Sequence, residues 1–387
     1  MLTLPLKERE ISMGRIQEIL AQFEEASEHP YRTIDACNAD KKKVIGLAPY
    51  FAPYELVHAA GMYPVELWGG NIDASEAHRY YPAFYCSILL SLLEYGLKGD
   101  YDFLSGIIIP TTCDGLRNLE ENWKYAKSDM SVIALTQPVN RKTQAAEDYY
   151  ANELHRVQHE LEEIAGHPIT DAQLFNSIQL YNKQKELMRR FPEVACDHLD
   201  VFTPKVRHYV YKAARVMPVE LHTRLVAELL DELDDVPVYD FDGPRLIATS
   251  ILMDSTELLD TLEQEGIAIV GDDIVGDSKR FETDAPAHVD PFVSLARIWP
   301  HIEGCSVLYD PKKLRGPMLI DLYNQRKADG ILISIIKFCE EEEFDYPVLK
   351  KDFEAEGIPV LYLETENQGR IDEQAATRIQ AFVEMLD

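Results

Sequence analysis

The stretch KKKVIGLAPYFAPYELVHAAGMYPVELWGG, residues 41–70, predicts the fold more strongly than any other part of the chain. Residues 44–48 form a short apolar run typical of a buried strand, and prolines follow it. Residues 54–60 are typical of a helix, and residues 63–67 of a second strand. Two strands joined by one helix indicate a crossover connection and therefore a parallel sheet.

The same alternation continues to about residue 140. The segment YCSILLSLLEYGLKG (85–99) predicts a helix that a glycine ends, and FLSGIIIP (103–110) predicts a fully buried strand. A helix over 113–127 and a strand over 131–138 follow. We therefore predict an N-terminal α/β lobe over residues 1–140.

Between residues 141 and 240 the pattern changes to helices without strands. Apolar residues from Leu154 to Ile164 recur on one helical face, and a glycine at position 166 ends that helix. Thr170 and Gln173 have the spacing of a capping box at the start of the next helix. The segment FPEVACD (191–197) predicts a break, and an acidic linker closes this helical middle domain.

Alternation of strands and helices resumes at Arg245 and predicts a C-terminal α/β lobe over residues 241–387. The predicted strands are 245–252, 266–273, 330–338 and 357–364, and the predicted helices between them include 255–265 and 345–356. The predicted class is therefore α/β, with two parallel-sheet α/β lobes of similar architecture separated by a helical segment.

Charge and hydropathy exclude several kinds of partner. With 67 acidic against 38 Lys and Arg residues, the chain has a net charge of -29, which repels a nucleic-acid backbone and an anionic membrane surface. The sequence contains no uncharged apolar stretch of spanning length, and the first residues lack the long apolar segment of a signal peptide. We expect a cytoplasmic protein with neither nucleic-acid nor membrane partners.

Three of the six cysteines stand at positions where α/β folds place functional groups. Cys113 follows the strand 103–110, Cys339 follows the strand 330–338, and the reactive crevice of parallel sheets lies beyond such carboxyl ends. Cys86 heads a helix, where free N–H groups and the helix dipole favour a thiolate. Two thiols from one lobe and one from the other could therefore converge on the cleft between the lobes.

A plainer alternative is that each thiol packs in a core, where free cysteines are common. Cys37, Cys196 and Cys305 have no special placement, and the Cys196–His198 pair is typical of structural residues rather than a metal site. The run Glu340–Glu343 after Cys339 is most simply a solvated helix face.

Several motifs resemble one family over nearly the whole chain. The segments GLAPYFAPYELVHAAGMYPVELWGG, YYPAFYCSILLSLLEYGLKG, IIIPTTCDG and IIKFCEEEE occur in the order typical of the 2-hydroxyacyl-CoA dehydratases. This family includes the benzoyl-CoA reductase subunits and the 2-hydroxyglutaryl-CoA dehydratase D-component. The residues around Cys86 are most similar to those of the beta subunit.

The resemblance implies a 4Fe-4S cluster, which by motif position Cys86, Cys113 and Cys339 would hold. It also implies a heterodimer with a homologous alpha subunit and an ATP-dependent iron-sulfur activator protein that supplies one electron. In the family this electron reduces the thioester of an (R)-2-hydroxyacyl-CoA to a ketyl radical, which loses water to give a 2-enoyl-CoA. An iron without a protein thiolate is the open, catalytic corner of such a cluster.

Glu55 matches a family position and is the candidate catalytic residue, where it would move a proton of the 2-hydroxyl group. Its alternative role is that of an acid in the first turn of a helix, which the dipole stabilises. Alternative functions for the chain are a benzoyl-CoA-type reductase subunit, a double-cubane reductase, and a two-lobed ligand-binding protein without a cluster.

Overall fold

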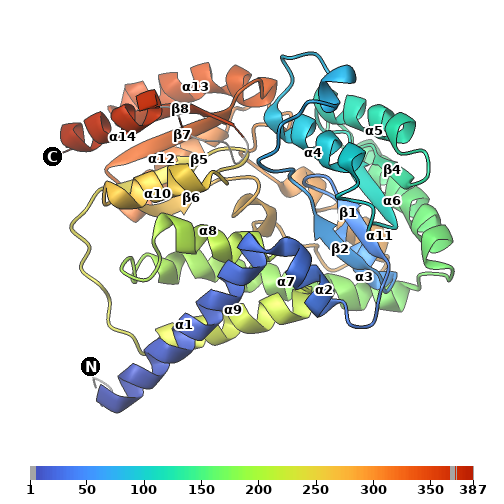
Figure 1. Ribbon diagram of the computed structural model, residues 1–387, viewed down its shortest axis with the longest axis horizontal. Coiled ribbons are helices and arrows are strands. Elements are labelled where there is room, and N and C mark those ends of the chain that lie inside the picture. The colour runs from blue at the N-terminus through green and yellow to red at the C-terminus, as the bar shows by residue number, and fades with distance from the viewer. Residues whose placement is uncertain (1–5, 367–370, 372, 387) are drawn as a thin grey trace.

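Two four-stranded parallel sheets form the framework of the protein (Figure 1). The computed structural model describes residues 6–366, 371 and 373–386, and, among these, the side chains from residue 13 onward except that of residue 373. The first sheet has the strand order β2-β1-β3-β4 and the second has the order β6-β5-β7-β8. The two orders are equivalent, so the prediction of an α/β protein with two similar parallel-sheet lobes is confirmed.

The first sheet arises from short buried strands close to the predicted positions. Its strands are β1 (Val44–Leu47), β2 (Tyr63–Glu66), β3 (Gly106–Pro110) and β4 (Ser131–Leu135). The connecting helices are α3 (Tyr54–Ala59), α4 (Ser87–Lys98) and α5 (Asp114–Ala126), with a short 3-10 turn η1 (Ala77–Arg79) before α4. Every residue of β1 and β3 is buried, as their uninterrupted apolar runs predict.

The second sheet repeats this plan. Its strands are β5 (Arg245–Thr249), β6 (Ala268–Asp272), β7 (Gly330–Ile336) and β8 (Val360–Thr365). Its helices are α10 (Thr256–Gln264), α12 (Arg315–Arg326), α13 (Glu340–Glu356) and α14 (Glu373–Leu386). The segment between β6 and α12 also forms the 3-10 turns η2 (Lys279–Phe281) and η3 (Trp299–His301) and the helix α11 (Pro291–Ala296), which packs against α6 and α7.

Alternate side chains of the second sheet enter two different cores. Leu246 and Leu332 pack with α10 and α14, whereas Ile247 and Ile331 pack with α12 and α13. The sheet is therefore covered by helices on both faces, as the absence of a polar face in β7 requires.

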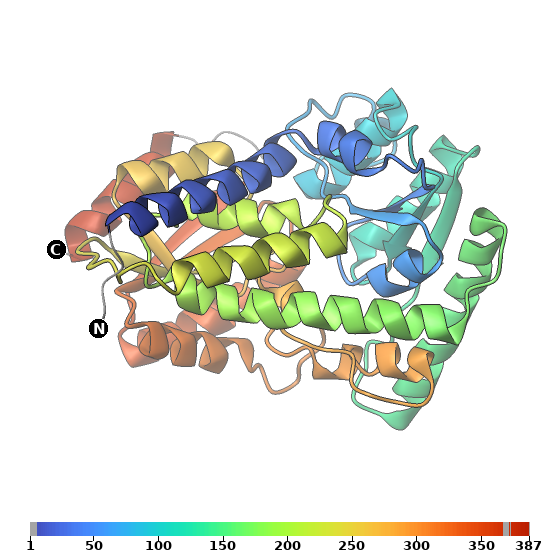
Figure 2. The ribbon, with the colours of Figure 1, turned by 90° about the horizontal axis from the view of Figure 1, so that it is seen from below.

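Long helices join the two lobes. They are α6 (Gln144–Ala165), α7 (Asp171–Ala195), α8 (Pro204–Ala213) and α9 (Val219–Leu233). Helix α7 begins with the predicted Thr170–Gln173 capping box, continues through Pro192 and ends at Ala195, within the break predicted over residues 191–197. It contacts α3 of the first lobe and β6 of the second, and Figure 2 shows it running along the molecule.

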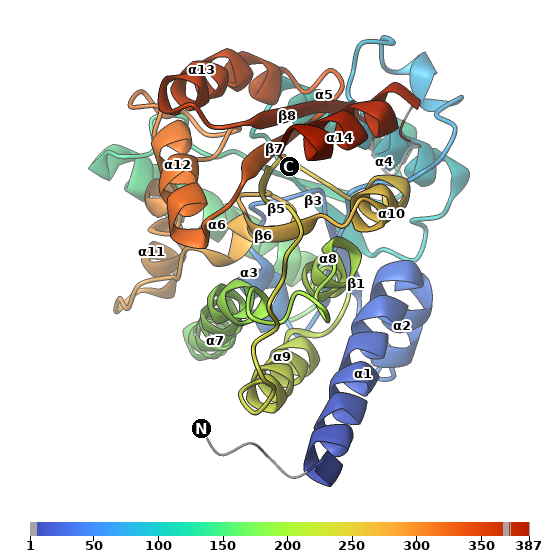
Figure 3. The same ribbon diagram turned by 90° about the vertical axis from the view of Figure 1, so that its left-hand side faces the viewer.

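Two helices precede the first strand, namely α1 (Leu6–Glu28) and α2 (Pro30–Cys37). Helix α1 packs against α8 and α9, so that a segment from the start of the chain joins the helical middle (Figure 3). Across the described ranges 6–366 and 373–386, no helix is both long and apolar enough to span a bilayer.

A buried histidine of α9, His222, makes the stability of this helical region depend on pH. His222 is fully buried, its Nε2–H donates to the carbonyl oxygen of Val210 at 2.9 Å, and Gln184 lies 3.1 Å from Nδ1. Burial lowers the pKa of His222 from 6.5 to about 4. The unfolded chain therefore takes up a proton between pH 7 and pH 5 that the folded chain does not, and stability falls as the pH falls.

We expect the unfolding free energy to fall by about 2 kcal/mol from pH 7 to pH 5 because of His222. Denaturant unfolding of wild type and His222→Gln at both pH values measures this contribution. The variant should be less stable at pH 7 but should lose less on acidification, whereas His167→Gln, at an exposed site, should behave as wild type does. An equal loss of unfolding free energy on acidification in all three proteins would show that His222 is not the source of the pH dependence.

Candidate functional site

Cys86, Cys113 and Cys339 line one pocket of about 390 Å³. Each of them is the N-cap residue of a helix, of α4, α5 and α13 respectively. The structure thus brings together the three thiols that the sequence singled out, and it does so at three helix N-termini. Such ends present free N–H groups and a partial positive charge, which favour an anionic group.

The equivalent topology of the two sheets explains how residues so far apart in sequence meet. Cys113 follows β3 and Cys339 follows β7, which occupy the same place in their sheets. In the first sheet the chain passes from β1 outward to β2 on one side and from β3 outward to β4 on the other. In the second sheet it passes from β5 to β6 and from β7 to β8 in the same way. A crevice opens at such a switch point, and here the two crevices face each other.

The loops after β1 and β5 complete the pocket. They contribute Pro49 and Tyr50 from the first lobe and Ile251 from the second. Tyr50 is buried, and its ring stacks on that of Trp68 with centroids 5.4 Å apart. The sequence analysis did not single out Tyr50, although its place directly after β1 is the signal that could have identified it.

Aromatic side chains form the rim of the pocket. Phe84 is 65% exposed and Phe338 is 48% exposed, and both line the pocket beside cysteines. Phe338 has a φ of 64°, an unusual conformation for a bulky residue, immediately before Cys339. The loop between β7 and α13 therefore contains a strained residue directly before Cys339.

Burial outweighs the helix N-termini in setting the acidity of the thiols. It raises the pKa of Cys86 to about 11, although backbone N–H groups such as that of Leu89 act in the opposite direction. Burial likewise raises the pKa of Cys113 and of Cys339. The expectation that the helix dipole gives Cys86 a lowered pKa is therefore wrong for the protein without a bound group, and metal binding would have to release the protons.

The acidic run after Cys339 is only partly solvated. Glu341 lines the pocket, and its Oε2 lies 3.9 Å from the Cys339 sulfur. Glu342 is buried, and burial raises its pKa to about 7, whereas Arg315 at 3.6 Å acts in the opposite direction. The interpretation of all four glutamates as a solvated face was wrong for Glu342, because its cation comes from another helix.

Cys37, Cys196 and Cys305 lie in other parts of the fold. The Cys196 thiol donates to the carbonyl oxygen of Val270 at 2.9 Å, which supports a packing role. Among the side chains that the structure describes, no three His, Cys, Asp or Glu converge closely enough to share one metal ion. A cubane cluster differs in this respect, since each thiolate binds a different iron at its own corner.

The pocket fits the donor chemistry of an iron-sulfur cluster. Three thiols enter it from three separate helices, and apolar side chains such as Ile88 and Leu89 line it together with charged ones such as Glu341. The N–H of Leu116 already donates to the Cys113 sulfur at 3.4 Å. Donors of this kind stabilise cluster sulfur and thiolate ligands.

Glu55 lies in a different and smaller pocket. It is buried in the first turn of α3, and its Oε1 pairs with Lys185 Nζ of α7 at 3.1 Å. The pocket beside it has a volume of about 80 Å³ and is walled by aromatic residues that include Tyr54, Tyr181 and Trp299. The structure therefore does not place Glu55 beside the three cysteines.

Comparison with known proteins gives one consistent result. The model of the family described as 2-hydroxyglutaryl-CoA dehydratase, D-component, matches residues 49–386. The (R)-phenyllactyl-CoA dehydratase beta subunit of Clostridium sporogenes is 40% identical over 375 residues, which cover 97% of this chain and 100% of that protein.

Two further relatives agree with this. Lactoyl-CoA dehydratase subunit beta of Anaerotignum propionicum is 38% identical, over 97% of this chain and 100% of that protein. Subunit beta of (R)-2-hydroxyglutaryl-CoA dehydratase of Acidaminococcus fermentans is 34% identical, over 96% of this chain and 100% of that protein. The resemblance seen in the motifs is confirmed, and this chain belongs to the 2-hydroxyglutaryl-CoA dehydratase D-component family.

Proposed function

We propose that this chain is the electron-relaying beta subunit of an oxygen-sensitive iron-sulfur (R)-2-hydroxyacyl-CoA dehydratase, a hydro-lyase that forms a 2-enoyl-CoA. The three relatives are named as beta subunits of phenyllactyl-CoA, lactoyl-CoA and 2-hydroxyglutaryl-CoA dehydratases, which supports the reaction class. The observation that carries the electron-relay role is the meeting of three thiols, from both lobes, in one pocket.

In this proposal Cys86, Cys113 and Cys339 hold a 4Fe-4S cluster. When bound, such a cluster supplies one-electron transfer at low potential, the chemistry that a ketyl-radical elimination of water requires.

The chain itself contributes the environment of that group. The N-termini of α4, α5 and α13 point donors toward the pocket and stabilise its negative charge. Tyr50 and Ile251 are buried and line the pocket. Buried neighbours and N–H groups aimed at sulfur act together on the reduction potential of a cluster.

The proposed partners follow from the reaction. A homologous alpha subunit would form the heterodimer and bind the 2-hydroxyacyl-CoA substrate, and an ATP-dependent iron-sulfur activator protein would deliver the electron. The relatives are themselves named as subunits of dehydratases, which supports a partner chain.

The other candidate functions have less support. A double-cubane protein needs more cluster ligands than the three thiols that meet in the pocket. A benzoyl-CoA-type reductase is disfavoured because the three relatives described above are all named as dehydratase subunits. A ligand-binding protein without a cluster would remain colourless after reconstitution with iron and sulfide.

Anaerobic co-expression with a candidate alpha subunit and activator tests the proposal. Iron counting on the purified complex should give about four irons for this chain. Dehydration of several (R)-2-hydroxyacyl-CoA esters should then depend on the activator and ATP. A complex without iron in this chain, or one that is equally active when this chain is omitted, would overturn the proposal.

Replacement of Glu55 tests whether this residue moves a proton. We expect Glu55→Gln to keep its full iron content and, in the complex, a turnover per iron within about twofold of wild type, since Glu55 pairs with Lys185 and lies outside the cysteine pocket. Its unfolding free energy should fall by about 1–3 kcal/mol, because the buried Lys185 loses its counter-charge.

Glu186→Gln, at a residue of α7 that is 63% exposed, is the control and should change neither property. A fall in turnover of about 10²-fold or more with iron retained would instead assign proton transfer to Glu55.

A further inference from the structure

One buried arginine lies where the two lobes and the helical middle region meet. Arg215 follows the end of α8 by two residues and is 5% exposed. Its guanidinium donates to Asp254 at 3.2 Å and to Asp277 at 3.0 Å. These two carboxylates belong to the loops that follow β5 and β6 of the second lobe. Arg215 therefore ties two loops of the second lobe to the end of a middle helix.

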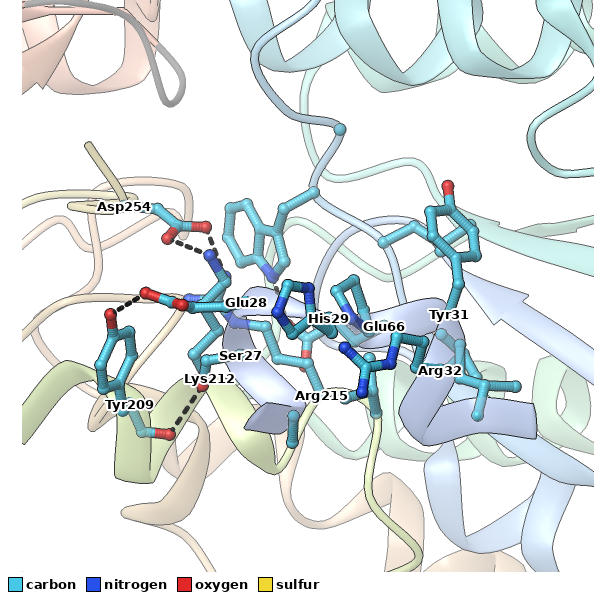
Figure 4. Close-up of a pocket in the computed structure, with 18 of the residues that line it drawn as sticks. Ser27, Glu28, His29, Tyr31, Arg32, Glu66, Tyr209, Lys212, Arg215 and Asp254 are labelled. Atoms are coloured by element: carbon cyan, nitrogen blue, oxygen red, sulfur yellow. Dashed lines mark hydrogen bonds and ion pairs between the residues drawn. The ribbon is translucent and has the colours of Figure 1, made fainter. Parts of the chain in front are cut away.

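The same residue also contacts the first lobe. Its carbonyl oxygen accepts a hydrogen bond at 2.8 Å from the N–H of Glu66, the last residue of β2. Its guanidinium carbon lies 5.5 Å from the centroid of the Trp68 ring, which is a favourable cation–π pair. Figure 4 shows Arg215, Glu66 and Asp254 among the side chains that line a cavity beside this junction. One residue thus binds both lobes.

Through Trp68, Arg215 supports a wall of the cysteine pocket in the first lobe. The Trp68 ring stacks on that of Tyr50, with centroids 5.4 Å apart, and Tyr50 lines the cysteine pocket. The Trp68 indole N–H donates to Glu66 at 2.6 Å, which fixes the orientation of the ring. A single aromatic ring therefore lies between Arg215 and a residue of the pocket wall.

The second lobe connects Arg215 to the pocket by an equally short route. The guanidinium donates to the carbonyl oxygen of Gly276 at 3.2 Å, and the N–H of Gly276 donates to the carbonyl oxygen of Ile251 at 3.0 Å. Ile251 lines the cysteine pocket. A Cβ atom at position 276 would lie 3.1 Å from the Arg215 guanidinium and 3.2 Å from Trp68. The loops of both lobes are therefore packed tightly against this arginine.

The ion pairs around Arg215 stay balanced when it is removed. Asp254 also accepts hydrogen bonds from Lys212 at 2.6 Å and from His208 at 2.9 Å. Asp277 lies 2.8 Å from the other ring nitrogen of His208. Burial opposes protonation of His208, but Asp277 and Asp254 outweigh burial and raise its pKa. Without Arg215, two carboxylates still face two cations, so its replacement removes a bridge and leaves no charge unpaired.

We propose that Arg215 is a positioning residue that holds the two walls of the cysteine pocket together, so that Cys339 of the second lobe stays in one pocket with Cys86 and Cys113 of the first. Its planar guanidinium reaches two loops of one lobe while it covers a ring of the other, which the single ammonium group of lysine cannot do. This role rests on the proposed function in that the thiols are cluster ligands, but the closure of the pocket can be measured without iron.

Thiol labelling of the full-length chain without iron tests this role. Cys339 and Cys305 are each 5% exposed, and Cys339 lines the cysteine pocket whereas Cys305 is not among its lining residues. Mass spectrometry after timed exposure to a maleimide, under native conditions, gives the labelling rate of each thiol. Opening of the pocket raises the ratio of the Cys339 rate to the Cys305 rate, whereas unfolding of the whole chain raises both rates together.

Two replacements of Arg215 are compared with a matched control. Arg215→Met should raise the Cys339 to Cys305 ratio by about tenfold, because the pocket opens locally once the bridge is lost. Arg215→Lys retains a cation, yet should raise the ratio by about threefold, because lysine lacks the planar fork. Lys212→Met removes a cation from the same Asp254 carboxylate and leaves the Arg215 bridge in place, so its ratio should stay within about twofold of wild type.

Iron release from the reconstituted chain gives a second readout. A chelator should remove iron fastest from Arg215→Met, more slowly from Arg215→Lys, and from Lys212→Met at the wild-type rate. Wild type that takes up no iron would count against the proposed function alone, because thiol labelling is measured without iron.

Three labelling results would overturn the positioning role. They are a wild-type ratio in Arg215→Met, a wild-type ratio in Arg215→Lys, and a rise in Lys212→Met equal to that in Arg215→Met. The second result decides the question even if Arg215→Met fails to fold, because Arg215→Lys keeps a cation beside the buried carboxylates.

Discussion

Cys113→Ala is expected to abolish the iron-sulfur absorbance of the anaerobically reconstituted chain. Wild type should bind about four irons, and the variant fewer than about one, because a cube held at only two corners loses iron to solvent and chelators. Of the three proposed ligands, Cys86 and Cys113 are partly exposed, whereas Cys339 is buried. Replacing Cys113 by alanine therefore removes the sulfur without opening a large core cavity.

The matched control is Cys196→Ala. Cys196 has a similar degree of exposure, but its thiol donates to the Val270 carbonyl and lies outside the cysteine pocket. This variant should keep its full iron and acid-labile sulfide. Near-ultraviolet circular dichroism of both apo variants should match that of the wild type, so that lost iron reports a lost ligand. Full iron in both variants would show that the ligand assignment is wrong.

The sheet architecture was predictable because each strand carries its own local signal. The runs at 106–110 and 330–336 are apolar throughout, and parallel strands covered on both faces have this pattern. The two halves of the chain show the same order of strands and helices, so that equivalent sheets followed from the pattern alone.

Interactions between distant segments were not predictable in this way. The partner of Glu55 is Lys185, which lies 130 residues later, and the sequence analysis could weigh only its local position in a helix. For Cys86, helix position predicted a lowered pKa, but burial, which depends on the other lobe, raises it.

The start of α13 depends both on its own sequence and on a residue of another helix. The helix was predicted from residue 345, yet it begins at Glu340, because four acidic residues in its first turn interact well with the helix dipole. Glu342 is buried beside Arg315, which lies 27 residues earlier on α12 and supplies its counter-charge. No pattern within either segment indicates this pairing.

Arg315→Met is expected to lower the unfolding free energy by about 3–5 kcal/mol, since it leaves the buried carboxylates of Asp273 and Glu342 without this cation, while Asp345 keeps Lys313 at 3.3 Å. Arg315 is 5% exposed, and it pairs with Asp273 at 2.9 Å, Asp345 at 3.2 Å and Glu342 at 3.6 Å. Methionine fills much of the same volume, so that loss of charge rather than loss of packing dominates the change.

Acidification should reduce this loss of unfolding free energy. In the variant, the unpaired buried carboxylates have raised pKa values, so that the folded state binds protons more readily than the unfolded state does. Its stability relative to wild type therefore rises as the pH falls. Denaturant unfolding at pH 8 and pH 5 measures the difference. Arg224→Met, at a residue 64% exposed and 3.9 Å from Glu228, is the control and should cost less than about 1 kcal/mol at either pH.

The position of Arg315 gives this prediction a second consequence. Its partners lie at the end of β6 and on α13, the helix that Cys339 caps, so that this one guanidinium fixes the start of α13 against the second sheet. If Cys339 holds one corner of a cluster, reconstituted Arg315→Met should release iron to a chelator faster than wild type at pH 8, and less so at pH 5. An iron-release rate equal to that of wild type in a destabilised variant would show that the Cys339 thiol is positioned by its own loop, independently of the buried ion pairs.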